Sequence, residues 1–166
     1  GAPANVACAL AKLGINSAFC GCLGDDWIGQ NFQTLFKDRG VNSQGLKLDQ
    51  LRPSRIVLVH RDLNGERSFQ GFVGDQGNGF ADQSLSVNDL AKSWPYLVQK
   101  ASWLLSGTIP LATKTSEEAL LWSIDKALQC DTKLAIDINW RATFWNPNNV
   151  PDAGPNSSEV AKIVPL

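Results

Sequence analysis

Glycines separate the first 40 residues into short segments, and the apolar residues between them indicate a helix, a strand and a second helix. After Gly1 the apolar residues recur at helical spacing, and Gly14 is placed to end the helix. The residues expected on its buried face are Val6, Ala9, Leu10 and Leu13. An apolar run over 18–23 predicts the strand that follows.

The second helix is expected to run from the turn after Gly24 to Gly40, with Asp25 or Asp26 as its N-terminal cap. Helix–strand–helix order with glycine turns is typical of α/β proteins. Such proteins usually bind their ligand at turns of this kind.

The size and composition of the chain exclude several classes of protein. With 166 residues and a net charge of −1, it fits one domain and carries no basic stripe for nucleic acid. No apolar stretch approaches the ~20 residues of a membrane helix, so no membrane association is expected. Four cysteines and one histidine form no zinc spacing. The favoured interpretation of the four cysteines is that they are buried free thiols. Free thiols suit a reducing compartment such as the cytoplasm or the plastid stroma.

The remaining chain alternates strand and helix patterns. Apolar residues over 56–59, followed by Asn64-Gly65, predict a β-hairpin. A helix is expected from Ser86 through Val98, and further apolar strands over 103–105 and 133–138. Strands that alternate with helices imply a mainly parallel sheet flanked by helices.

Polar residues gather at the end of the last predicted strand. If strand alternation continues through this segment, Asp137, Asn139 and Arg141 point to one side. An arginine fork suits the oxygens of a phosphoryl group. The alternative is an Asx turn at Asn139 with Arg141 paired on the surface.

The spacing of Gly1, Asn5, Ala7, Gly14 and Gly24 resembles the first signature of the ribokinase (PfkB) carbohydrate kinases, and is most similar to their fructokinase-like branch. The resemblance implies that residues 1–166 are part of a ribokinase-like α/β domain. It also implies a small β lid inserted at about 43–73, which covers the sugar and offers a surface for a homodimer.

The same resemblance implies the positions of the ligand contacts. Gly1 and Asn5 in the first turn, with Arg67 and Phe69 in the lid, are expected near a small-molecule sugar; a solvated strand charge is the alternative for Arg67. Asn139 and Arg141 fall in a segment similar to the family's Asp-x-Asn-x-Arg and are expected near the transferred phosphate.

One part of the family's machinery has no counterpart in these 166 residues. The family's catalytic base is an aspartate in a Gly-Ala-Gly-Asp turn, and that tetrapeptide does not occur in the chain. We therefore expect the sugar-facing half of an ATP-dependent kinase that uses ATP and Mg²⁺, with the C-terminal half absent. No catalytic residue and no metal ligand is assigned to this half, and it should be inactive alone.

Two other functions remain open. A non-catalytic kinase-like protein that serves as an interaction module would carry the same residues. A Rossmann-type nucleotide-binding domain is the third reading. Against it, the glycines around Gly21 lack the G-x-G-x-x-G order, and a lid hairpin is not expected there.

Overall fold

The computed structural model describes residues 1–97 and 100–166. The first helices and strands are α1 (Ala2–Lys12), β1 (Ala18–Gly24), α2 (Trp27–Arg39), β2 (Asn42–Asp49), β3 (Ile56–Arg61) and β4 (Arg67–Val73). The later ones are the 3₁₀ turn η1 (Ala81–Ser84), α3 (Val87–Leu97), β5 (Trp103–Gly107), the 3₁₀ turn η2 (Ile109–Ala112), α4 (Lys114–Leu128), β6 (Lys133–Asp137), α5 (Ala142–Trp145) and α6 (Ser157–Ile163). Val98, expected in the third helix, lies outside the described residues.

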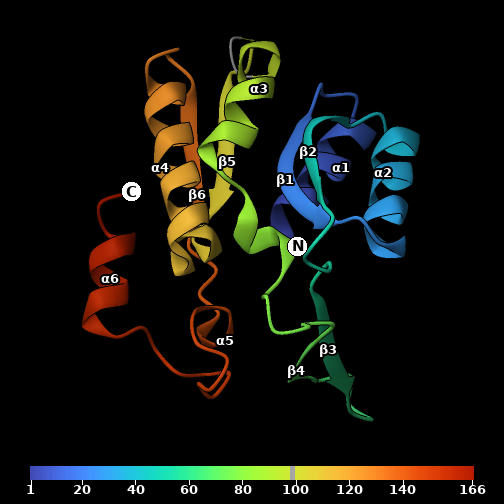
Figure 1. Ribbon diagram of the computed structural model, residues 1–166, viewed down its shortest axis with the longest axis vertical. Helices are drawn as coiled ribbons and strands as arrows, with labels where there is room; N and C mark the ends of the chain where they lie inside the picture. The colour runs from blue at the N-terminus through green and yellow to red at the C-terminus, as the bar shows by residue number, and fades with distance from the viewer. Residues whose placement is uncertain (98–99) are drawn as a thin grey trace.

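Among the described residues, the strands form three pairs. β1 pairs in parallel with β2, and β5 pairs in parallel with β6, while β3 and β4 form an antiparallel hairpin. Figure 1 shows β1, β2, β5 and β6 running in the same direction, with the hairpin and α5 beyond their carboxyl ends. The expectation of an α/β fold with parallel strands flanked by helices is confirmed.

Two clusters of buried side chains hold the helices to opposite faces of β1. Phe19 packs with α1 and α2, in the cluster around Ala4, Ala7 and Phe36. The next residue, Cys20, packs instead against the cluster between α3 and α4 that contains Trp94. Because successive side chains of a strand point to opposite faces, β1 has helices on both sides.

The buried face of α1 differs from the expected one. Val6 and Leu13 are 38% and 76% exposed, whereas Ala4 and Ala7 are buried. A shift of two residues turns a helix by about 200°, so the opposite side is buried. Alanines have no bulky side chain and let α1 approach Phe36 closely, which the spacing of the larger residues could not indicate.

The predicted lid insertion over about 43–73 divides into two parts in the structure. Residues 42–49 form β2, which pairs with β1 and belongs to the main body. The hairpin of residues 56–73 projects from that body (Figure 1). As predicted, Asn64-Gly65 lies in its turn, where the Asp62 carboxylate accepts from the backbone N–H groups of Asn64 and Glu66.

Within residues 1–97 and 100–166, no helix combines the length and the apolar composition that crossing a bilayer requires.

Truncating Phe36 should destabilise the fold far more than truncating its neighbour. Phe36 is fully buried, so Phe36→Ala should lower the free energy of unfolding by about 3–5 kcal/mol. Leu35 is 37% exposed, and Leu35→Ala should cost about 1 kcal/mol. Urea unfolding followed by circular dichroism measures both, and equal losses would contradict the assigned core.

Candidate functional site

The candidate site lies at the carboxyl ends of the parallel strands. β1 ends at Gly24, β2 at Asp49, β5 at Gly107 and β6 at Asp137. In parallel α/β sheets, ligands bind in the crevice outside these ends. Here the β3–β4 hairpin and α5 border this edge of the molecule (Figure 1).

Asp26 connects three parts of this edge. As the N-cap of α2, its carboxylate accepts from the backbone N–H groups of Ile28 and Gly29, at 3.1 and 2.9 Å. It also accepts from the backbone N–H and the hydroxyl of Ser54, at 2.7 and 2.9 Å. Ser54 Oγ in turn accepts from the N–H of Gly24, at 2.9 Å. The residue that precedes the root of the hairpin is therefore fastened to the end of β1.

Gly24 allows this close approach. A methyl group on its Cα would lie 2.5 Å from the backbone nitrogen of Ser54 and 2.9 Å from the carbonyl oxygen of Arg52. Both are backbone atoms that cannot rotate away. Glycine at the end of β1 is therefore required by the loop that crosses it.

Asp49 holds the first half of the same loop. Its carboxylate accepts from the backbone N–H groups of Leu51 and Arg52 and from the hydroxyl of Ser84, the last at 2.5 Å. Burial alone raises the pKa of Asp49, but these hydrogen bonds and the charge of Arg52 outweigh it and hold the pKa below its ordinary value.

Arg55, directly after Ser54, carries a nearly buried charge at the base of the hairpin. Its side chain is 9% exposed, and its Nε lies 3.2 Å from both carboxylate oxygens of Asp82. The guanidinium carbon lies 4.4 to 4.9 Å from three ring centres. These rings belong to Phe72 on β4, Phe80 before η1, and Phe144 on α5. We call these five residues the Arg55 cluster.

The segment after β6 turns sharply. β6 ends at Asp137, and Asn139 adopts a φ of 24°, a conformation that few residues other than glycine and asparagine tolerate. Strand alternation therefore stops before Asn139. The prediction that Asp137, Asn139 and Arg141 share a strand face is wrong, because it assumed that the strand continues through Arg141. The Thr108 hydroxyl donates to the carbonyl oxygen of Ile138 at 2.6 Å and fastens the turn to the end of β5.

Asn139 and Arg141 keep much of their hydrogen-bonding capacity. In the described part of the chain, the Asn139 side chain makes no hydrogen bond, so the Asx turn is not formed. Arg141 is exposed and donates to the carbonyl oxygen of Trp140 at 2.8 Å, and no ion pair of Arg141 occurs among the described residues. Both side chains are thus available to a polar ligand.

The structure links some of the predicted site residues. The Phe69 ring packs on Phe72 at 5.1 Å between ring centres, and Phe72 packs on Phe144 at 4.7 Å. Phe144 follows Arg141 by three positions, so Phe69 and the Asn139–Arg141 turn are connected through the Arg55 cluster. Gly1, the N-cap of α1, is exposed, and its contact with a ligand stays a prediction.

Asn5 and Arg67 are not linked in this way. Both are exposed, and within residues 1–97 and 100–166 neither side chain makes a hydrogen bond. Asn5 lies in the first turn of α1, where its N–H donates to the carbonyl oxygen of Gly1 at 3.2 Å. Their contact with a ligand stays a prediction.

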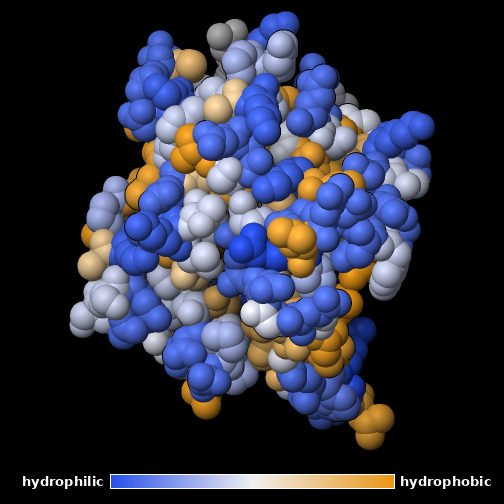
Figure 2. Space-filling view, in the orientation of Figure 1, coloured by the Kyte–Doolittle hydropathy of each residue, from blue (hydrophilic) through white to orange (hydrophobic). Residues whose placement is uncertain are grey.

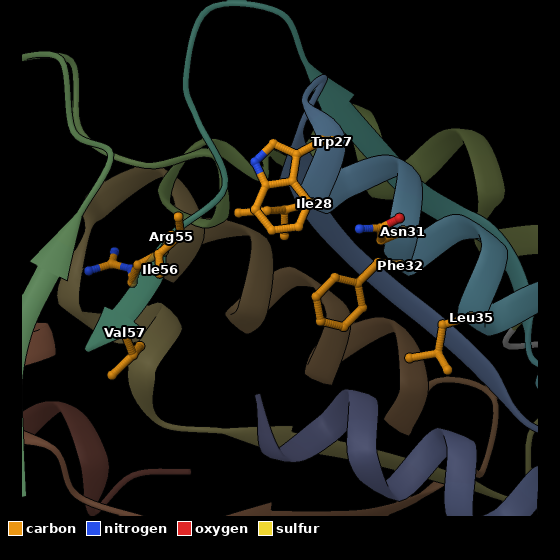
Figure 3. A pocket seen from close by; sticks show the side chains of 8 residues that line it. All are labelled: Trp27, Ile28, Asn31, Phe32, Leu35, Arg55, Ile56 and Val57. Atoms are coloured by element: carbon orange, nitrogen blue, oxygen red, sulfur yellow. The ribbon is translucent and has the colours of Figure 1, made fainter. Parts of the chain in front are cut away.

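A cavity of about 410 Å³ lies beside the candidate site. Figure 3 shows side chains of α2 on one side and the start of β3 on the other. Its lining residues are Trp27, Ile28, Asn31, Phe32, Leu35, Arg55, Ile56 and Val57. None of the six predicted ligand contacts lines it, and the Arg55 guanidinium points away from it in Figure 3.

Sequence reasoning missed Arg55 and Phe144. Both lie in segments where a surface charge and an aromatic residue are ordinary. The one available signal was Asp82, in the Phe80-Ala81-Asp82 segment after the hairpin. A partly buried carboxylate needs a cationic partner, and in the structure that partner is Arg55.

Comparison with known proteins defines the class. The pfkB family carbohydrate kinase profile matches residues 1–163. The chain is 35% identical to probable fructokinase-5 of Arabidopsis thaliana over 87% of its length, and 32% identical to aminoimidazole riboside kinase of Salmonella typhimurium over 98%. It spans about half the length of these relatives, 43% and 49%.

A solved structure supports the same assignment. Fructokinase from Vibrio cholerae in its fructose, ADP and calcium ion bound form matches 99% of the chain with a TM-score of 0.77 and 28% identity. The chain covers 48% of that structure. The fold is thus ribokinase-like. The chain belongs to the pfkB family of carbohydrate kinases, as its first signature indicated.

Acid should remove the stabilisation that Asp26 provides. Burial alone raises the pKa of Asp26, but the hydrogen bonds from Gly29, Ser54 and Ile28 outweigh it, so the folded-state pKa lies below the unfolded one. The stabilisation is then complete above the unfolded pKa of about 3.9 and is lost as the pH falls through the folded value. Asp26→Ala should cost about 1–2 kcal/mol at pH 7 and progressively less below pH ~4.

Asp25→Ala is the matched control. Asp25 is exposed, and its side chain makes no hydrogen bond within the described residues, so this change should leave stability nearly constant. Thermal unfolding between pH 2.5 and 7 measures both variants. A pH-independent difference between Asp26→Ala and the unaltered protein would contradict the assignment.

Proposed function

We propose that the chain forms the sugar-binding part of an ATP-dependent carbohydrate kinase of the fructokinase type. Such an enzyme transfers the γ-phosphate of ATP to a sugar hydroxyl. The observation that carries the proposal is the arrangement at one edge of the molecule. There the hairpin and the Asn139–Arg141 turn are joined by the Arg55 cluster, outside the carboxyl ends of the strands.

The relatives support this substrate class. The Vibrio cholerae structure holds fructose and ADP, and the Arabidopsis relative is named a fructokinase. The Salmonella relative, similar over nearly the whole chain, is named for aminoimidazole riboside. We therefore propose a sugar or a riboside as the substrate class, with fructose as our first choice.

The chemistry of the six predicted contact residues agrees with this proposal. Gly1 and Asn5 at the start of α1, with Arg67 and Phe69 from the hairpin, would contact the sugar through hydrogen bonds and an apolar ring face. Asn139 and Arg141 would lie near the transferred phosphate, where amide and guanidinium N–H groups bind anionic oxygens. These six residues include no general base, so their proposed role is binding and orientation.

The proposed kinase would use ATP and Mg²⁺. Within residues 1–97 and 100–166, no three Asp, Glu, His or Cys side chains gather in a way that could hold a metal ion. We therefore assign no Mg²⁺ ligand to these residues and derive no step through the metal.

Binding of sugar can be tested apart from turnover. The 166-residue chain should bind D-fructose in isothermal titration calorimetry, and Asn5→Ala should weaken binding about tenfold, as loss of a hydrogen bond to a ligand does. The chain should show no ATP-dependent phosphorylation of fructose, because it carries no Gly-Ala-Gly-Asp turn.

Asn16→Ala is the control, because Asn16 is exposed and precedes the opposite end of β1. Binding of aminoimidazole riboside without fructose would keep the kinase class and change the substrate. Binding of neither compound would favour the non-catalytic interaction module. Measurable turnover of fructose by this chain would refute the expected inactivity.

The hairpin is also our proposed homodimer surface. Its strands expose apolar side chains and unpaired edges, which favour pairing with another chain. The exposed fractions are 41% for Val57, 44% for Leu58, 53% for Val59 and 39% for Val73. Figure 2 shows hydrophobic residues on the hairpin, including its tip.

Light scattering should therefore find a dimer. Val59→Asp should convert it to a monomer, because an unpaired charge would be buried in the interface. Leu121→Asp is the control, since Leu121 on α4 is 47% exposed and far from the hairpin in sequence. A monomer at high protein concentration would contradict the proposed surface.

A further inference from the structure

Arg55 occupies a distinctive place in the chain. It follows Ser54, which Asp26 fastens to the body, and precedes Ile56, where the hairpin begins. Its backbone therefore belongs to the root of the hairpin. Its guanidinium reaches across to Asp82, outside the hairpin, at 3.0 Å between Nη2 and Oδ2.

The three rings around the guanidinium come from three separate segments. Phe72 belongs to the hairpin, Phe80 to the loop before η1, and Phe144 to α5, which is more than 60 positions further along the chain. The ring of Phe72 also packs edge-on against that of Phe144, at 80° between their planes. The cluster is therefore a contact between the hairpin and the segment that follows β6.

Arginine suits this place better than lysine does. A side chain with 9% exposure cannot keep its charge solvated, so its partners must compensate. A guanidinium can bond a carboxylate through a planar fork while aromatic rings lie over it. An ammonium group is a compact point charge without this planar fork, so it cannot pair with Asp82 in the same way while it contacts the rings.

We propose that Arg55 is a positioning residue that fastens the β3–β4 hairpin to α5. Through it, the sugar contacts expected on the hairpin and the phosphate contacts expected at Asn139 and Arg141 are held in one relative geometry. The consequence for binding rests on the proposed kinase function. The fastening itself rests only on the contacts of the Arg55 cluster.

Hydrogen–deuterium exchange of the 166-residue protein tests the fastening. Phe144→Leu removes a ring from α5 without leaving a buried charge unpaired. It should speed amide exchange in the hairpin, residues 56–73, by about 2- to 30-fold, the range expected for losing one cation–π contact. Arg55→Lys should speed exchange in the hairpin and in residues 142–145 together.

Trp145→Phe is the matched control. Trp145 is also on α5, but its ring packs on Trp140, and its buried indole N–H has no hydrogen-bond partner among residues 1–97 and 100–166. This variant should leave exchange in the hairpin unchanged. The proposal is overturned if Phe144→Leu leaves amide exchange in the hairpin unchanged. It is also overturned if Trp145→Phe speeds that exchange equally.

Fructose affinity provides the second measurement. If the unaltered protein binds fructose, Phe144→Leu should raise the dissociation constant about three- to tenfold, although Phe144 is not an expected sugar contact. Unchanged affinity would refute the positioning role. If the unaltered protein binds no fructose, the proposed substrate fails, and the exchange rates alone decide whether Arg55 fastens the hairpin.

Discussion

The carboxylate of Asp26 is the junction on which the candidate site depends. It accepts four hydrogen bonds, two from the start of α2 and two from Ser54. The chain must therefore leave β2, cross the end of β1 and begin the hairpin at one defined place. Gly24 makes this crossing possible because a larger residue would meet the backbone of Ser54. The same carboxylate thus caps α2 and fixes the position of a hairpin that lies about 30 residues further along the chain.

From this junction the structure builds outward through charge and aromatic packing. Asp26 holds Ser54 in place, and Arg55 follows it in the chain. The Arg55 guanidinium pairs with Asp82 and contacts three phenylalanine rings. The rings carry the connection to α5 and so to the turn at Asn139. Several weak contacts around one nearly buried charge thereby hold the hairpin and α5 together at the candidate site. Neither pair of parallel strands would fix this arrangement alone. The membership of the chain in a kinase family makes this edge the expected ligand surface.

Sequence reasoning predicted the parts of the fold whose causes lie close together in the chain. Asp26 caps α2, Gly40 ends it, and Asn64-Gly65 forms the hairpin turn. These roles depend on residues within a few positions, and each is found as expected. The reasoning failed where two patterns overlapped. Almost every residue of α1 is apolar or small, so the buried face around Ala4 and Ala7 could not be distinguished from the one around Val6. It failed again at Asn139, where one residue with positive φ ended the alternation on which the expected geometry depended.

The sequence by itself determined the family, the helix–strand–helix order of the first 40 residues and the position of the hairpin turn. These depend on spacing and on contacts between near neighbours, which can be read directly from the order of residues. Only the tertiary structure decided that Arg55 is nearly buried while Arg67 is exposed, and that Phe144 contacts Phe72. Two arginines near one hairpin look alike in sequence. Their environments differ because the residues that surround Arg55 come from segments far apart in the chain and meet only after folding.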